Sequence, residues 1–277
     1  MSWLDLLLVP LGFAIGAYGT IVGAGGGFVL VPALLLIFPD DSQREITAVS
    51  LAVVLLTSIS GSIAHARRRL IDYRTGLLLV LTAVPASFAG AYAVRFLPRS
   101  LFDVTFGALL VALALFVVFG MSRGGQTMRS PMRAGRAVVR RSMDRGDGAV
   151  SQYAYDVRQG MALSGGTGFV ATMFGVGGGI IQVPLMATFL RIPIDISVAT
   201  SQFMLIFMAA AGVSLHALAG SFEPADAARI GALGLGAIMG AQAGALISRR
   251  LSGSAVTRLL AAGLILIGGR LVLAPAF

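Results

Sequence analysis

The sequence contains no cysteine and no lysine, and each absence excludes a class of chemistry. Without cysteine the chain has no disulfide, no thiolate metal ligand and no thiol nucleophile. Without lysine the glycine-rich segment GAGGG at residues 23–27 is not a phosphate-binding P-loop, which needs a lysine after its glycines. All 21 basic side chains are therefore arginines.

Charge is scarce as well: only 12% of the 277 residues are charged, 57% are hydrophobic and the mean hydropathy is +0.89. A soluble domain of this size cannot bury so much apolar surface, so we expect the lipid bilayer to be its solvent. The formal charge of +9 does not indicate nucleic-acid binding, because the arginines lie between apolar runs rather than on one face of a soluble module. Arginines at those places normally set membrane topology.

Charged and turn residues divide the chain into eight mostly apolar segments. Four cover residues 6–39, 46–66, 76–94 and 104–122, and four cover residues 159–190, 196–222, 230–248 and 254–274. We predict an all-α polytopic membrane protein with a first transmembrane repeat at residues 1–122, a basic linker at 123–157 and a second transmembrane repeat at 158–277. The N-terminus carries Asp5 and no basic stretch before its apolar run, so it does not resemble a cleaved signal peptide.

The first segment of each half is too long for one straight span. About 32 residues of helix, at roughly 1.5 Å each, extend well beyond a hydrocarbon core of about 30 Å. Each of these segments contains a glycine cluster, at residues 23–27 and 175–179, and glycine is unfavourable inside a helix. We therefore predict that each segment breaks at its glycines.

The two glycine clusters belong to an internal duplication. VGAGGGFVLVP at residues 22–32 and FGVGGGIIQVP at residues 174–184 share six of eleven residues at a spacing of 152. The correspondence continues through three further pairs: Ser50 with Ser201, His65 with His216, and Gly90 with Gly240. Internal repeats with discontinuous helices are typical of secondary transporters, which bind substrate near the membrane midplane between the halves.

The linker and the loops carry the arginines that orient the protein. Residues 123–158 hold eight arginines, several at helical spacing, which suits either a basic segment on the membrane surface or a disordered connector, cytoplasmic in both cases. If all eight segments cross the membrane, the 21 arginines divide 14 to 7 between its sides. If each broken segment returns to the face it entered, they divide 16 to 5. The second arrangement inverts the repeats, and the arginine bias favours it slightly.

Carboxylates are missing from the middle of every predicted span, because the 12 acidic residues lie at segment ends or in loops. Cation transporters and proton pumps usually carry such a group there, so the pattern disfavours a cation as substrate. A helix that begins after a glycine break offers free N–H groups and the positive end of its dipole to an anion. We therefore expect a small anion to bind at the two clusters, at Gly25, Gly26, Gly27, Gly177, Gly178 and Gly179. The alternative is that these glycines only permit tight helix packing.

Uncharged donors in the spans could complete such a site. We expect substrate contacts from Ser50, Gln182, Thr200, Ser201 and Gln202, and the remaining donors are Thr57, Ser58, Ser60 and Gln242. Each glutamine could instead form an interhelical hydrogen bond. His65 and His216 are candidates for proton coupling or anion contact, or else interfacial anchors. Two histidines without nearby carboxylates make a poor metal site, so we predict no metal and no cofactor.

These motifs resemble the sulfite exporter TauE/SafE family. The resemblance covers essentially the whole chain and rests on the two glycine motifs, the run Thr200–Gln202 and the plan of two times four segments. It implies a bacterial inner-membrane transporter of sulfur-containing oxyanions, such as sulfite, sulfoacetate or other organosulfonates, and not an enzyme. The first-half run Val49–Leu51 lacks the glutamine of its counterpart, which leaves symmetric roles open.

We therefore predict export of such an anion by alternating access between the halves. Another small anion as cargo, a scaffold that transports nothing, and an intramembrane hydrolase built on Ser164 and His216 are the alternatives. Gly236, Gly240 and Gly244 form a GxxxGxxxG stripe that should allow close helix contact, either within one chain or between the protomers of a homodimer.

Overall fold

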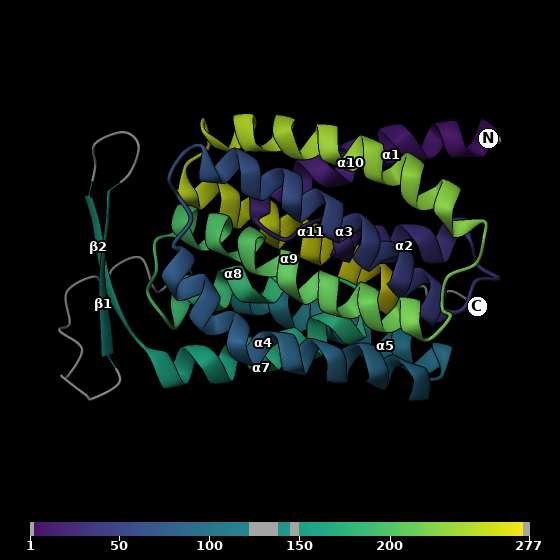
Figure 1. Cartoon of the computed structure of the whole chain (residues 1–277), viewed down its shortest axis with the longest axis horizontal. Coiled ribbons are helices and arrows are strands. Elements are labelled where there is room, and N and C mark those ends of the chain that lie inside the picture. The colour runs from purple at the N-terminus through teal and green to yellow at the C-terminus, as the bar shows by residue number, and fades with distance from the viewer. Residues whose placement is uncertain (1–2, 122–137, 145–149, 274–277) are drawn as a thin grey trace.

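The computed structural model describes residues 3–121, 138–144 and 150–273, and this part of the chain is mostly helical (Figure 1). Its ten α-helices are α1 (Trp3–Val22), α2 (Gly27–Ile37), α3 (Gln43–Ala66), α4 (Tyr73–Ala93), α5 (Arg99–Leu115), α7 (Val157–Met173), α8 (Gly179–Thr188), α9 (Ile194–Leu218), α10 (Asp226–Ser248) and α11 (Gly253–Leu273). The 3-10 turn η1 (Val94–Phe96) follows α4, and the π-helical turn η2 (Phe116–Met121) follows α5. Strands β1 (Val138–Asp144) and β2 (Val150–Asp156) form an antiparallel pair.

Both long apolar segments break at their glycines, as the sequence predicts. Helix α1 ends at Val22 and α2 begins at Gly27, while α7 ends at Met173 and α8 begins at Gly179. Each break contains three glycines with positive φ, namely Gly23, Gly25 and Gly26 in the first and Gly175, Gly177 and Gly178 in the second. Residues with a side chain rarely adopt positive φ, so the glycines allow the chain to reverse direction here.

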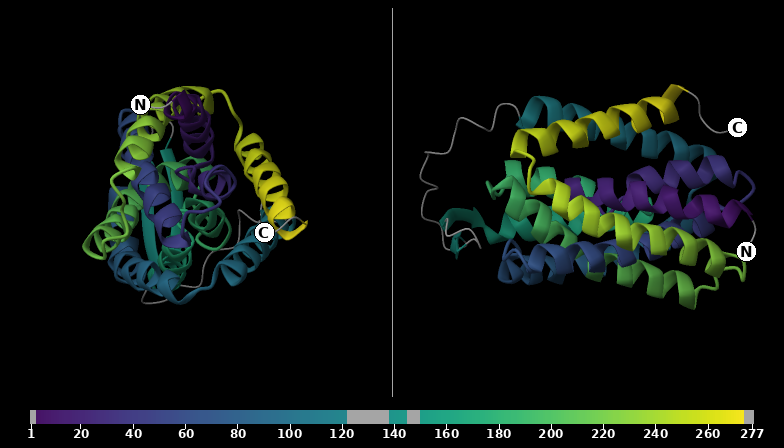
Figure 2. Two further views of the ribbon diagram at one scale, coloured as in Figure 1. Left: turned by 90° about the vertical axis from the view of Figure 1, so that its right-hand side faces the viewer. Right: turned by 90° about the horizontal axis from the view of Figure 1, so that it is seen from above.

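The two broken segments enter the bundle from opposite ends. Helix α1 enters from the end of the bundle where α11 finishes, and α2 returns to that same end (Figure 1). Helices α7 and α8 start and finish at the other end, where the two strands lie (Figures 1 and 2). Between these pairs, α3, α4, α5, α9, α10 and α11 run from one end of the bundle to the other.

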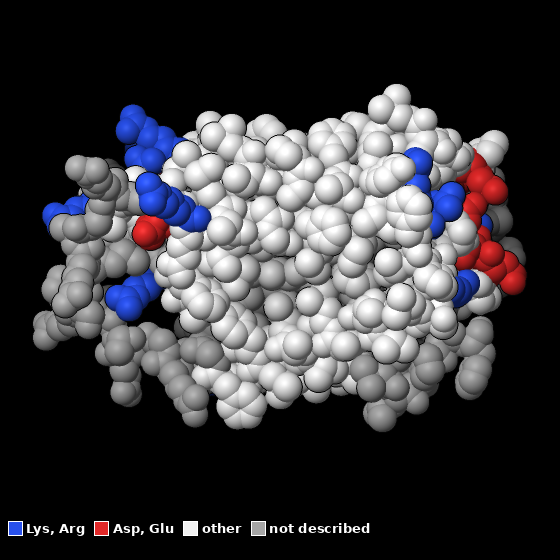
Figure 3. Space-filling view, turned by 90° about the horizontal axis from the view of Figure 1, so that it is seen from below, with Lys and Arg blue, Asp and Glu red and all other residues white. Residues whose placement is uncertain are grey.

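Among the described residues, five helices are long and apolar enough to cross a membrane, and shorter apolar helical stretches are Leu7–Val22 of α1, α2, α8 and Gly253–Gly269 of α11. Large apolar side chains are exposed on the outside of the bundle, among them Leu81, Phe119, Leu246 and Leu266. On the face in Figure 3, the drawn charges gather at the two ends and leave an uncharged band between them. This is the surface of a multi-pass membrane protein, whose middle faces lipid and whose ends face water.

Helices α3 and α9 form the centre of the bundle. They pack against each other. In each, 72% of the most apolar 18-residue stretch is buried, compared with 33–44% in the other three long helices. Because these two helices have little lipid-facing surface, their polar side chains face protein. The serines, threonines and glutamine of the predicted site on α3 and α9 therefore lie in the interior.

Two seams of backbone contact hold the outer helices to the bundle. Helix α10 packs on α1, and a methyl group added at Gly240 would lie 2.0 Å from the Phe13 carbonyl oxygen. Helix α4 packs on α7, where a methyl group at Gly90 would lie 2.1 Å from the Phe169 carbonyl oxygen. Gly236 and Gly244 make similar approaches to α1. The GxxxGxxxG stripe thus serves helix packing within one chain.

The basic linker contains a β-hairpin that the arginine spacing did not predict. Part of the linker, including Arg129, Arg133 and Arg136, lies outside the described residues. Arg140, the next arginine at helical spacing, lies in β1 and pairs with Ala154 of β2. The strands form because Tyr153 and Tyr155 alternate with smaller residues and bury their rings on the membrane-embedded bundle.

Candidate functional site

The two glycine turns each leave backbone donors without partners at the start of a helix. Among the described residues, no acceptor is assigned to the N–H groups of Gly26 and Gly27, or to those of Gly178 and Gly179. All four residues are buried. Buried N–H groups are nearly always hydrogen-bonded in folded proteins, so these four donors are available to a ligand or to water. The positive ends of the α2 and α8 dipoles add to their attraction for an anion.

The two turns pack directly against each other at the centre of the bundle. A methyl group on Gly27 would lie 2.7 Å from the Val176 Cα and 2.9 Å from the Gly175 carbonyl oxygen. A methyl group on Gly179 would lie 2.2 Å from the Gly23 carbonyl oxygen and 2.4 Å from the Ala24 Cα. The backbones therefore touch, and an anion that bridges both turns requires them to separate.

One serine ties each glycine turn to the central helix of the opposite half. Ser50 of α3 donates a hydrogen bond of 2.7 Å to the carbonyl oxygen of Gly175, and Ser201 of α9 donates one of 3.2 Å to the carbonyl oxygen of Gly23. Both hydroxyls are fully buried. The structure therefore brings both predicted site residues to the glycine turns, where their protons are already committed to backbone acceptors.

The other predicted contact residues lie at varying distances from the turns. Thr200 is buried on α9 and accepts a hydrogen bond of 3.1 Å from the Asp72 N–H. Gln202 faces α1 and approaches the Gly19 carbonyl at 3.4 Å, and its amide oxygen has no partner. Gln182 of α8 donates 2.9 Å to the Ser164 hydroxyl, and its amide oxygen is unpartnered too. Both glutamines thus retain free hydrogen-bonding capacity in the interior.

Several remaining donors serve packing rather than a ligand. Thr57 donates to the Val53 carbonyl within α3. Ser60 donates to the Ile238 carbonyl of α10 at 2.9 Å and accepts from the Gln242 amide at 2.8 Å, which ties α3 to α10. Ser164 accepts its hydrogen bond from Gln182, so the structure gives no support to pairing with His216.

The two histidines lie at opposite ends of the bundle, because α3 and α9 run in opposite directions (Figure 1). His65 is 1% exposed in the last turn of α3, beside the backbone of Thr20, and neither ring nitrogen makes a hydrogen bond of regular geometry. His216 is 2% exposed in the last turn of α9, and its Nε2 has no partner. They lie near different arginines, Arg68 for His65 and Arg95 for His216. The structure does not bring them together, and within the described residues no group of His, Cys, Asp or Glu could hold a metal ion.

Thr20 and Ser62 were not predicted from the sequence, and Ser58 was predicted only as an available donor. The hydroxyl oxygens of all three are buried and have no hydrogen-bond partner among the described residues. A buried polar group without a partner costs roughly 1–3 kcal/mol. Because Ser58, Ser62 and His65 follow one another at intervals of four and three residues, they share one face of α3. That spacing is the sequence feature from which a polar face of α3 could have been predicted.

Comparison with known proteins identifies the family. The model of the family "Sulfite exporter TauE/SafE" matches residues 8–271. The probable membrane transporter protein YunE of Bacillus subtilis is 29% identical over 273 residues, 96% of this chain and 97% of its own. A probable membrane transporter protein of Methanocaldococcus jannaschii is 29% identical over 71% of this chain and 67% of its own.

A third relative, the probable membrane transporter protein YdhB of Bacillus subtilis, is 27% identical over 75% of this chain and 76% of its own. No solved structure matches the chain. The family match spans both glycine turns and nearly all of the helical bundle. The chain therefore belongs to the sulfite exporter TauE/SafE family and is a multi-pass membrane transporter rather than an enzyme.

Proposed function

We propose that this protein is a secondary transporter that exports a small sulfur-containing oxyanion, such as sulfite, sulfoacetate or another organosulfonate, by alternating access. The observation that carries the proposal is the pair of buried glycine turns whose N–H groups at Gly26, Gly27, Gly178 and Gly179 lack acceptors. Backbone N–H groups at helix starts bind oxyanions of phosphate or sulfate type without a charged side chain.

The arrangement of the helices supports two inverted halves around this site. The first half comprises α1–α5 and the second α7–α11, and their broken segments enter from opposite ends (Figure 1). Helix pairs α3 with α9 and α5 with α11 join equivalent segments, while α1 with α10 and α4 with α7 exchange places. This is the pairing that a two-fold axis in the membrane plane produces, as in transporters built from inverted repeats.

We propose that the strand-bearing end faces the cytoplasm of a bacterial inner membrane. For re-entrant broken segments the sequence predicts 16 of the 21 arginines on the side of the membrane that carries the linker, and the described linker strands β1 and β2 lie at this end of the bundle (Figure 1). Cytoplasmic loops retain arginine. Export of a single negative charge from a cell with a negative interior gains about 2.3 kcal/mol per 100 mV, so proton coupling is not required for export.

The interior offers the anion no competing carboxylate near the turns. Among the described acidic side chains, Asp72, Asp103 and Asp226 are buried: Asp72 caps α4, Asp226 begins α10 and Asp103 lies in the second turn of α5. The proposed site consists of the N–H groups at the two turns together with Gly25 and Gly177. Ser50 and Ser201 anchor the turns, and the amides of Gln182 and Gln202 supply further polar contacts. Thr200, which accepts from the Asp72 N–H, belongs to its surroundings. Because the two turns are in contact in this conformation, they must separate before an anion can bind between them.

Flux into proteoliposomes tests the proposal. Purified protein should transport sulfite or an organosulfonate from a panel that also contains sulfate, chloride and a monovalent cation. Transport of the cation with indifference to every anion would refute the proposal, and transport of chloride alone would replace the sulfur oxyanion with another small anion.

A matched pair of glycine variants tests the role of the turns. Gly178 and Gly220 both have positive φ, at 108° and 65°, so Gly178→Ala and Gly220→Ala both strain the backbone, Gly178→Ala more strongly. At Gly178 the new methyl group meets only the flexible end of Met208 closer than 3.0 Å, while at Gly220 it meets nothing within 4 Å. Gly178→Ala should lose most of the flux in a folded protein, and Gly220→Ala should keep it. Equal flux in both variants would remove the second turn from the site.

A further inference from the structure

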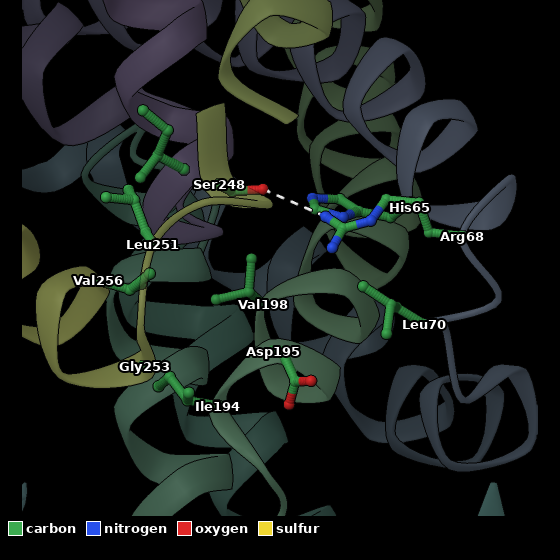
Figure 4. A pocket seen from close by; sticks show the side chains of 11 residues that line it. His65, Arg68, Leu70, Ile194, Asp195, Val198, Ser248, Leu251, Gly253 and Val256 are labelled. Atoms are coloured by element: carbon green, nitrogen blue, oxygen red, sulfur yellow. Dashed lines mark hydrogen bonds between the residues drawn. The ribbon is translucent and has the colours of Figure 1, made fainter. Parts of the chain in front are cut away.

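A cavity lies at the arginine-rich end of the bundle, where α3 and α10 finish and α9 and α11 begin (Figure 4). Its volume is about 290 Å³. Its polar lining comes from His65, Arg68, Ser248 and Asp195, and the Arg68 guanidinium donates to the Ser248 hydroxyl at 3.4 Å. Ile21 of α1 and Val198 of α9 also line it.

The cavity borders the first glycine turn. Ile21 is in the last turn of α1, two residues before Gly23. Val198 touches the turn itself, since a methyl group on Gly23 would lie 2.8 Å from the Val198 Cα. Ile21 and Val198 therefore lie between the cavity and the proposed anion site, together with buried polar side chains of α3.

A file of unpartnered polar groups runs along α3 from the cavity to the turn. His65 lines the cavity, Ser62 lies one turn before it, and Ser58 lies one turn further. A methyl group on Gly25 would lie 3.3 Å from the Ser58 hydroxyl oxygen, so the file ends at the first turn. All three side chains are more than nine-tenths buried, and no hydrogen bond of regular geometry satisfies their polar atoms.

Two more unpartnered groups face the file from neighbouring helices. A methyl group on Gly61 would lie 3.2 Å from the Thr20 hydroxyl oxygen and 3.3 Å from the Gln202 amide carbon. Thr20 and Gln202 are both fully buried, and the Thr20 hydroxyl and the Gln202 amide oxygen lack partners. The absence of a side chain on Gly61 keeps this stretch of the file open to both groups.

The described residues of the second half form no such file. At the spacing of 151 that relates Ser50 to Ser201, Ser58 and Ser62 correspond to Ala209 and Val213. The counterpart of Gln202 is Leu51, whose methyl carbon would lie 2.7 Å from a methyl group on Gly212. The route from His216 to the second turn is therefore lined by apolar groups and by Thr172, whose hydroxyl already donates to the Gly168 carbonyl, so within the described residues the unpartnered polar file lies in the first half only.

We propose that the cavity and the file of Ser58, Ser62 and His65 form a half-channel that conducts the anion between the arginine-rich face and the first glycine turn. This inference rests on the proposed transport function. Hydroxyl groups and an imidazole supply hydrogen bonds to an oxyanion without a fixed charge that would trap it. Because the lining contains one arginine and one aspartate, its formal charge is zero, and it suits singly charged oxyanions better than doubly charged ones.

Cysteine accessibility tests the route without relying on transport. The chain has no cysteine of its own, so Ser62→Cys and its counterpart Val213→Cys each introduce a single thiol. A negatively charged alkylsulfonate methanethiosulfonate should modify Ser62→Cys at least about 10-fold faster than Val213→Cys. Adding Arg68→Gln should slow this anionic reagent relative to a cationic one, whereas Arg67→Gln, which changes an exposed neighbour, should not. Equal modification of the two thiols would overturn the half-channel.

Flux and stability together separate conduction from structure. Ser58→Ala with Ser62→Ala removes two hydroxyls that have no hydrogen-bond partner among the described residues, so the melting temperature should stay constant or rise while sulfite flux falls about tenfold. Ser60→Ala breaks two hydrogen bonds between α3 and α10, so it should lower the melting temperature and leave the flux of the folded protein unchanged. Normal flux in the double variant would overturn the proposal while leaving the transport function intact. A wild-type protein that moves no anion would refute the transport function, and the labelling rates would still decide whether the file is a route.

Discussion

Replacing Tyr153 with phenylalanine should weaken the docking of the linker hairpin on the bundle. The Tyr153 hydroxyl donates 2.6 Å to the Asp72 carboxylate, and Tyr155 donates 2.9 Å to the Thr75 hydroxyl. Asp72 also caps α4 through the Thr75 N–H and lies 3.7 Å from Arg141 of β1. These contacts make one buried carboxylate the anchor of both strands.

The size of the effect follows from the charge of the acceptor. A hydrogen bond to a charged group contributes about 1.5–3 kcal/mol, and one between neutral groups about 0.5–1.5 kcal/mol. After Tyr153→Phe the carboxylate of Asp72 keeps Thr75 and Arg141 as partners, so we expect about 2 kcal/mol, or roughly a 30-fold rise in the open population of the hairpin. Tyr155→Phe, with its neutral acceptor, should cost about 1 kcal/mol and raise that population roughly five-fold.

Tryptic cleavage after Arg140 measures the open population, because Arg140 is exposed on β1 and cleavage follows opening when reclosing is fast. Cleavage should be fastest in Tyr153→Phe, intermediate in Tyr155→Phe and slowest in the unmodified protein. In an Asp72→Asn background the extra cost of Tyr153→Phe should shrink, since the charge is gone. Equal cleavage of Tyr153→Phe and the unmodified protein would refute this account of the docking.

Three further outcomes are expected. Burial, and then the hydrogen bond to Asp72, raise the pKa of Tyr153 above its usual 10.0. The contribution of Tyr153 to the stability of the hairpin is therefore fully present below pH 10 and falls as the pH rises toward the raised pKa, which cleavage after Arg140 at increasing pH would show. Gly240→Ala should lower the melting temperature in detergent because its methyl group meets the Phe13 carbonyl, whereas Gly231→Ala, with nothing within 4 Å on the same helix, should leave it unchanged or raise it. Ser50→Ala should destabilise the protein by about 1 kcal/mol and Ser201→Ala by less, in line with hydrogen bonds of 2.7 Å and 3.2 Å, and thermal unfolding of both variants would check the order.

The features that the sequence predicts well depend on local chemistry. The breaks after Val22 and Met173 follow from glycine clusters whose backbone adopts positive φ. Helix-spaced glycines on α10 predict close packing, although their partner on α1 becomes known only from the fold. In both cases the missing side chain itself is the signal, and it does not depend on distant residues.

The features that the sequence did not predict depend on contacts across the chain. The hydroxyls of Ser50 and Ser201 look like free donors, yet each bonds a turn more than one hundred residues away. Arg140 fits a helical spacing, but the rings of Tyr153 and Tyr155 bury themselves on α4, and this burial decides for a strand. Long-range packing overrides the local pattern in each case.

The packing also indicates which parts of the bundle can move against each other. At the α1–α10 and α4–α7 seams, backbone touches backbone through Gly240 and Gly90, and such contacts leave no side chain that could repack. The α3–α9 contact, by contrast, includes a cluster of side chains, among them Leu51, Val54 and Leu205, that can change rotamer. We therefore expect each seam to move as a unit while α3 and α9 shift and the glycine turns part. A Gly240→Ala protein that folds but no longer transports would contradict this division, because it would show that the seam takes part in the motion.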